Sequence, residues 1–323
     1  MGIWEKQIIQ VNGQETEATA PIIISASRAT DIPAFYGKWL IDKFQKGYLV
    51  KINPFNGKRE FISLKKVRVI VFWTKNAKPF MKWLKFFDDL GIHYYFLYTV
   101  NNYPEYELHL PKLETRIENF IELSQLLGKQ RVLWRFDPLI LSQEISEHLL
   151  LERIHTVGEK IHKFTTRLIF SFVELSYKKV QANLKKYGKK FFTPSCEQKL
   201  RISKEIVKLC KTWDIQARTC ASADDFSHIG AQPNKCIDDE LMVRLWHNDT
   251  SLMKFLGYSP LIPYISSHKL KDKGQRKNCK CIYSKDIGRY NTCPHGCIYC
   301  YANASFEKAL ENYNKHNFKS LSI

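Results

Sequence analysis

Apolar residues are followed by the charged Arg135 and Asp137 in the stretch Val132-Leu133-Trp134-Arg135-Phe136-Asp137-Pro138. Its aromatic and apolar residues predict a buried strand, and comparable runs recur through the first two-thirds of the chain. The expected strands are Ile22–Ser25, Val67–Trp73, Tyr94–Val100, Val132–Phe136, Leu168–Val173 and Ile215–Thr219. Between and after them, apolar residues recur every three or four positions, which predicts amphipathic helices. The expected helices are Pro33–Lys46, Ala77–Leu90, Lys112–Leu127, Ile145–Lys163, Lys178–Tyr187 and Cys196–Thr212.

Strands that alternate with helices predict a parallel sheet joined by helical crossovers. The regular spacing favours an α/β fold with a complete or partial TIM-type (β/α) barrel. The alternation fades after residue 245, so we expect a barrel-like domain over 1–245 and a cysteine-rich segment over 246–323 packed on the barrel mouth. Within that segment, residues 269–289 are basic and poor in aliphatic side chains, which predicts a long loop. A last helix is expected at Ala304–Tyr313.

Composition restricts the class of protein. Of 323 residues, 44% are hydrophobic and 25% charged, which excludes extended disorder. Lys and Arg outnumber Asp and Glu by 50 to 32, a net charge of +18 that fits a nucleic-acid substrate or partner, or simply a well-solvated lysine-rich surface. No basic leader followed by an apolar run is visible, nor an apolar run of about 20 residues. We therefore expect a soluble, cytoplasmic protein with no membrane partner.

Polar residues follow the expected strands, at the edge where a (β/α) barrel carries its active site. Arg135 and Asp137 share one strand face because side chains alternate. The candidates for ligand contacts are Ser25, Ser27, Thr74, Asn76, Asn101, Arg135, Asp137 and Arg218. The alternative for each is a loop residue that caps the next helix or pairs with a neighbour.

The most informative motif is Cys293-Pro294-His295-Gly296-Cys297-Ile298-Tyr299-Cys300. Three cysteines at this spacing can bind three irons of a cubane cluster, and Gly296 permits the tight turn between them. The fourth iron would then lack a protein ligand, which favours a catalytic cluster over an electron-transfer cluster. The alternative is a closed zinc site in which Cys279 or Cys281 supplies the fourth thiolate.

This motif resembles the cluster motif of the radical S-adenosylmethionine (SAM) superfamily. Its position near the C-terminus, together with Cys279-Lys280-Cys281 and the Trp134–Pro138 strand, resembles domain of unknown function 1848. The resemblance implies that Cys293, Cys297 and Cys300 hold a 4Fe-4S cluster whose open iron binds SAM. It also implies reductive cleavage of SAM, a flavodoxin or ferredoxin as electron donor, hydrogen abstraction from an unknown substrate, and SAM or substrate contacts by the eight polar candidates.

Four further cysteines form a candidate second site, namely Cys220, Cys236, Cys279 and Cys281. Four thiolates suffice for a second iron–sulfur cluster or a zinc ion. The alternative is that Cys220 and Cys236 are small buried apolar residues, the role that also fits Cys196 and Cys210. If zinc replaces iron at the cysteine motif as well, the competing function is a zinc-containing nucleic-acid-binding protein without catalysis.

Overall fold

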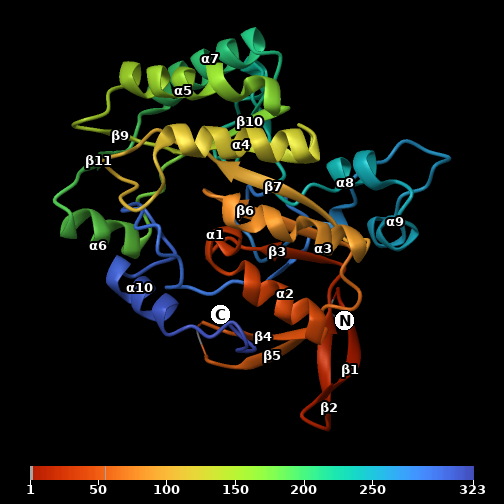
Figure 1. The fold of residues 1–323 in the computed structure, drawn as a ribbon. Coiled ribbons are helices and arrows are strands. Elements are labelled where there is room, and N and C mark those ends of the chain that lie inside the picture. The colour runs from red at the N-terminus through yellow and green to blue at the C-terminus, as the bar shows by residue number, and fades with distance from the viewer. Residues whose placement is uncertain (1–2, 55) are drawn as a thin grey trace.

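The computed structural model describes residues 3–54 and 56–323, and its centre is an eight-stranded parallel sheet (Figure 1). The strands run in the order β13-β12-β10-β8-β7-β6-β3-β14. Their bounds are Gln232–Pro233 (β13), Gln216–Thr219 (β12), Arg167–Phe172 (β10), Val132–Leu139 (β8), His93–Thr99 (β7), Val69–Thr74 (β6), Ile23–Ala26 (β3) and Lys285–Asp286 (β14). The six expected strands are confirmed, and the two short edge strands β13 and β14 add to them.

The expected α/β class with parallel strands is confirmed, but no pairing between β13 and β14 in the described residues closes the sheet into a barrel. A second hydrophobic cluster covers the face that a closed barrel would fill with its own strands. In this cluster, Met242 and Leu252 accompany the sheet residues Val71 and Leu97. Met242 belongs to α8 (Asp239–Trp246) and Leu252 to α9 (Thr250–Leu256), two helices that sequence analysis did not predict.

Helices cover the other face of the sheet and build the main core. They are α1 (Ile32–Phe35), α2 (Gly37–Lys46), η1 (Lys78–Trp83), α3 (Leu84–Asp89), α4 (Leu113–Leu127), α5 (Glu147–Ile161), η2 (His162–Phe164), α6 (Lys178–Lys186) and α7 (Cys196–Thr212). Each expected helix is present, with two differences. The expected Pro33–Lys46 helix is broken at Tyr36, whose φ of −123° leaves the helical region. The expected Ala77–Leu90 helix begins as a 3-10 turn.

A separate four-stranded sheet, ordered β1-β2-β5-β4, flanks the main sheet. Its strands are Glu5–Val11 (β1), Gln14–Ala20 (β2), Arg59–Ser63 (β5) and Tyr48–Ile52 (β4). Asn12 and Gly13 join β1 to β2 with φ angles of 51° and 81°, as a two-residue hairpin turn requires. Sequence analysis missed all four strands; most residues of β1 and β2 are polar, so these two strands lack a continuous apolar run.

Smaller elements complete the chain. They are β9 (Leu141–Ser142), β11 (Phe191–Phe192), η3 (Ser227–Ile229), η4 (His268–Leu270) and α10 (Phe306–Asn314). Helix α10 confirms the predicted last helix, and the end of the chain returns to β4, where the Val50 N–H donates to the Leu321 carbonyl over 2.8 Å. Within the described ranges, no helix has the length and apolar character needed to span a membrane.

Candidate functional site

A cavity of about 1200 Å³ opens at the carboxyl ends of the parallel strands, and we call it the mouth cavity. Residues of both sheets and of the C-terminal segment line it. All nine cysteines of the chain are free, and seven of them line this cavity. They form two sets: Cys293, Cys297 and Cys300, which we call the triad, and Cys220, Cys236, Cys279 and Cys281, which we call the quartet. The fold therefore gathers the reactive sulfur chemistry of the chain in one place.

The triad lies on a loop that is fixed by backbone contacts to the segment after β7. Glu107 and Cys297 form an antiparallel bridge, and the Ile298 N–H donates to the Tyr106 carbonyl over 3.0 Å. Gly296 has a φ of +67°, and a Cβ on it would lie 2.4 Å from His109 Cδ2. Only glycine fits this turn without a clash, as the sequence motif suggests.

Asp31 connects the triad loop to the sheet. Its carboxylate accepts hydrogen bonds from the Ala34 N–H at the start of α1 (3.0 Å), the Thr74 hydroxyl (2.8 Å) and the Lys75 N–H (2.7 Å). It also bonds to His295 Nε2, 2.7 Å away, and both residues are buried. One carboxylate therefore joins β3, the end of β6 and the triad loop.

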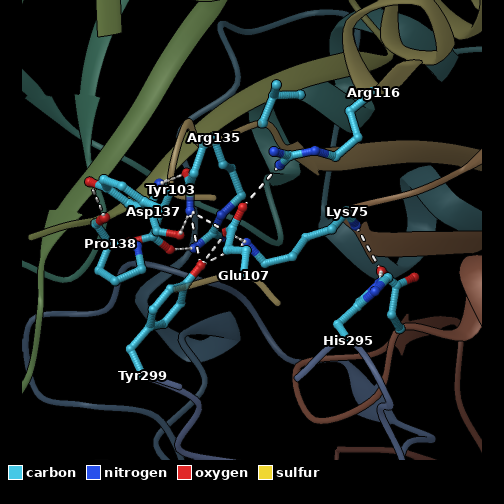
Figure 2. A network of polar contacts seen from close by, with 12 residues as sticks. Lys75, Tyr103, Glu107, Arg116, Arg135, Asp137, Pro138, His295 and Tyr299 are labelled. Carbon is cyan, nitrogen blue, oxygen red and sulfur yellow. Dashed lines mark hydrogen bonds and ion pairs between the residues drawn. The ribbon is translucent and has the colours of Figure 1, made fainter. Parts of the chain in front are cut away.

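Glu107 is the centre of a buried polar network beside the triad (Figure 2). Its carboxylate accepts hydrogen bonds from Lys75 Nζ (2.6 Å), Asn101 Nδ2 (3.0 Å) and Arg116 Nη1 (3.0 Å), and from the Tyr299 hydroxyl. Burial alone would raise the pKa of Glu107, but the two cations lower it below its ordinary value. Because Tyr299 directly precedes Cys300, this network fixes the second half of the triad loop.

Arg135 and Asp137 form an ion pair at the end of β8, and both line the mouth cavity. Burial opposes ionisation of Asp137, yet Arg135 and the Ser171 hydroxyl together lower its pKa below the ordinary value. Arg135 Nη1 also donates to Cys236 Sγ over 3.3 Å. The pair therefore reaches the quartet as well as the open cavity.

The structure divides the eight polar candidates. Four of them line the mouth cavity, namely Ser27, Thr74, Arg135 and Asp137. Asn101 lies in the Glu107 network instead. Ser25 is fully buried and donates to Asp286 Oδ2 over 3.0 Å, while Asn76 accepts from the Lys78 N–H over 3.3 Å.

Arg218 does not reach the mouth cavity. It bonds to Gln216 and the Pro233 carbonyl, and lines a separate cavity of about 350 Å³. Ser25, Asn76 and Arg218 therefore do not line the cavity that holds the cysteines, because alternation along a strand predicts a face but not the depth of a side chain within it.

Sequence analysis missed several polar residues around the cysteines. They are Arg28, Asp31, Lys75, Glu107, His295 and Tyr299. Arg28, Asp31 and Lys75 lie in the segments after expected strands, so the same rule that selected Ser27 and Thr74 could have found them. Glu107 has no such signal, because it lies in an irregular loop.

The cysteine side chains do not converge on a metal-binding position in this conformation. Among the described residues, no group of three or more His, Cys, Asp or Glu side chains is arranged to hold a metal ion. The donor chemistry nevertheless fits a thiophilic group, since seven free thiols face one cavity. Three buried nitrogens near them, Arg28 Nη2, Arg135 Nε and His295 Nδ1, have no hydrogen-bond partner in the described part of the chain. Burial raises the pKa of the Cys297 thiol to about 12, so metal binding there would displace a proton.

The fold and the cavity together define an α/β protein with a cysteine-lined site at the carboxyl edge of a parallel sheet. A family model described as Domain of unknown function (DUF1848) matches residues 23–302, and the chain belongs to that family. A search of curated proteins gives no match.

Among solved structures, the chain is similar to that of a provisionally assigned alpha-L-fucosidase from Bacteroides thetaiotaomicron. The two are 11% identical, the match covers 91% of this chain and 94% of that one, and the TM-score is 0.26. A likeness at this TM-score carries no argument about the present chain.

Proposed function

We propose that the protein is a radical-SAM-type iron–sulfur enzyme whose triad holds a 4Fe-4S cluster in the mouth cavity. The observation that supports this most directly is that three cysteines at the expected spacing line one cavity with polar groups from the ends of parallel strands. In this proposal, the open sheet serves as a partial barrel. With cluster and SAM bound, the site would supply a one-electron cleavage of SAM that produces an organic radical able to abstract hydrogen from a substrate.

The chain's own residues would position and shield these groups. Cys293, Cys297 and Cys300 provide three thiolates, which leaves one iron of a cubane without a protein ligand. Glu107 and Asp31 hold Tyr299 and His295 of the loop, so the segment that carries the three cysteines is fixed before a cluster binds. The three triad cysteines are only partly exposed, which limits the access of water.

The lining of the cavity favours an anionic substrate, and we propose nucleic acid as the class to test first. Ten Lys and Arg residues line the cavity against six Asp and Glu residues. Lys58, Arg59 and Arg276 lie on its exposed rim, where a phosphate backbone could approach. Retention on RNA or DNA that falls steeply with salt would support this class, whereas retention that is independent of salt would contradict it.

The proposed function is tested by anaerobic reconstitution with iron and sulfide, followed by reduction with dithionite and an assay for 5′-deoxyadenosine. We expect SAM-dependent formation of 5′-deoxyadenosine and methionine in the wild type. The Cys297→Ser variant should lose this activity, while the control Cys196→Ser should keep it, because Cys196 is exposed and lies outside the cavity. A wild-type protein that holds zinc but no iron at the triad would refute the proposal and favour the non-catalytic zinc-containing nucleic-acid-binding protein.

A further inference from the structure

Four cysteines from three segments of the chain form a second set at the mouth cavity. Cys220 directly follows β12, Cys236 precedes α8, and Cys279 and Cys281 lie between η4 and β14. All four line the cavity. This quartet is distinct from the triad, and the proposed function does not use it.

Contacts of the cysteine sulfurs link the segments that carry the quartet. Cys220 Sγ and Cys236 Sγ are 3.6 Å apart, and Cys281 Sγ accepts the Cys236 N–H over 3.2 Å. Cys279 and Cys281 are two positions apart in the chain, and both line the cavity. A separation of 3.6 Å is too long for a disulfide, but is close to the spacing of about 3.8 Å that follows from tetrahedral metal–sulfur bonds of about 2.3 Å.

Several N–H groups donate to the sulfur atoms of the quartet. Cys281 Sγ accepts a second backbone hydrogen bond, from the Ile237 N–H over 3.4 Å. Cys236 Sγ accepts from Arg135 Nη1 (3.3 Å) and Asn234 Nδ2 (3.4 Å). Such N–H donors stabilise the negative charge of metal-bound sulfur.

Two arginines add compensating charge. Arg28 lies close enough to Cys281 and Cys236 to interact with them electrostatically, and Arg135 contacts Cys236 directly. Each guanidinium has one buried nitrogen without a partner in the described residues. Four thiolates around a dication carry a net charge of −2. The two guanidinium groups offset part of this charge, because Arg135 also pairs with Asp137.

We propose that Cys220, Cys236, Cys279 and Cys281 bind one thiophilic metal centre, a zinc ion or an iron–sulfur cluster, separate from the triad. The four thiol groups do not yet converge on one point, so binding requires them to turn to other staggered χ1 rotamers. The quartet is a closed site, because four protein ligands complete the coordination of zinc or of a cubane cluster.

The centre would tie the C-terminal segment to the sheet. In that segment, the Asp272 N–H donates to the Cys281 carbonyl (2.9 Å) and the Ile282 N–H donates to the Ile237 carbonyl (3.2 Å). Few other backbone contacts hold residues 257–280, which contain the exposed Leu261 and Ile265. Metal at the quartet would therefore add to the contacts of Leu270 and Tyr264, which already hold part of this stretch.

The test measures zinc and iron per chain in anaerobically purified and reconstituted protein. The double variant Cys279→Ser/Cys281→Ser should lose about one zinc or about four irons and keep the metal of the triad. The Cys297→Ser variant should lose the metal of the triad and keep that of the quartet. The control Cys196→Ser should lose neither. Loss of zinc identifies a single ion, and loss of iron identifies a cluster. Equal metal content in the wild type and the double variant would overturn the proposal, whatever happens at the triad.

A second measurement needs no variant and so does not depend on variant folding. In the native wild type, metal at the quartet should protect four thiols from alkylation, and a chelator strong enough to remove it should expose them and speed proteolysis within residues 257–280. Mass spectrometry assigns the modified positions, with the exposed Cys196 as the internal reference. Quartet thiols that react equally before and after metal removal would overturn the proposal.

Discussion

Asp31 Oδ2 and His295 Nε2 are 2.7 Å apart, although the two residues are separated by 264 positions in the chain. The contact joins the loop after β3 to the motif that carries the triad. The Asp31 carboxylate also accepts the Lys75 N–H and the Thr74 hydroxyl, so its loss would affect three segments together.

Replacing Asp31 by Ala should destabilise the fold by about 3 kcal/mol, because it removes the cap of α1 and leaves buried donors without an acceptor. Urea unfolding monitored by circular dichroism measures the loss. The matched control is Asp89→Ala, whose exposed carboxylate pairs only with Lys85 over 2.7 Å and should matter by less than about 1 kcal/mol. Equal losses in the two variants would contradict this role of Asp31.

Gly296→Ala should prevent assembly of the triad site. The added Cβ would meet His109 Cδ2 at 2.4 Å, in a backbone conformation that side chains rarely adopt. We expect a cost of about 2 kcal/mol or more and loss of most iron from the reconstituted protein. Gly91→Ala is the matched control, because Gly91 has a φ of +64° but no atom within 4 Å of its Cβ position.

The control separates the two causes. Gly91→Ala should show only the conformational strain, about 1 kcal/mol, and keep its iron. If both variants behave alike, the contact with His109 does not matter. The double variant His109→Ala/Gly296→Ala should recover part of the lost iron, since it removes the atom that the new Cβ would meet.

The sequence predicted the parallel sheet well because its strands are buried on both faces and therefore appear as continuous apolar runs. It did not predict β1 and β2, whose polar side chains lack that signal, although the Asn12-Gly13 turn marks the hairpin between them. The sequence pattern also does not show whether the parallel sheet closes into a barrel. Closure depends on whether the inner face packs on itself or on other elements, here α8 and α9.

The candidate site was predicted only where local chemistry revealed it. Cysteine spacing identified the triad, and the quartet was predicted from four further cysteines near that motif or the strand ends. The structure brings both sets to one cavity. Glu107 could not be found in this way, since its importance comes from partners such as Arg116 and Tyr299 that lie far apart in the chain. Burial of polar partners from different segments is a property of the fold rather than of any short motif.

Glu107→Gln should destabilise the protein by about 3 kcal/mol and release the triad loop. The variant keeps one acceptor but leaves the buried Arg116 and the partly buried Lys75 without a carboxylate. Thermal unfolding and the iron content after reconstitution measure the two effects. Glu122→Gln, which breaks the exposed ion pair with Lys78, should change stability by less than about 1 kcal/mol and leave the iron content unchanged. Normal iron retention by Glu107→Gln would show that the network does not support the triad.

Cys210 provides a test of the division among the cysteines. It is buried in the main core, where burial raises the pKa of its thiol to about 12, and it lines neither cavity. Cys210→Ala should cost about 1–2 kcal/mol from the loss of packing and leave the zinc and iron contents unchanged. Elemental analysis of the purified variant checks this. A change in metal content would mean that the two sets at the mouth cavity do not account for all metal-binding cysteines.

The stability of the fold should fall between pH 7.5 and 5.5 partly because of His93. Its ring stacks on Trp246, and its Nε2 atom is 3.0 Å from Asp249 Oδ2. Burial lowers the pKa of His93; Asp249 opposes this shift and Arg68 reinforces it, so the net pKa is below the ordinary 6.5. The unfolded chain therefore takes up the proton first, and the stability that His93 contributes is full above pH 6.5 and lost as the pH falls below it.

The His93→Gln variant should show a smaller fall in Tm over this range than the wild type, while the exposed control His148→Gln should match the wild type. A parallel fall in all three proteins would exclude His93 as a source of the pH dependence.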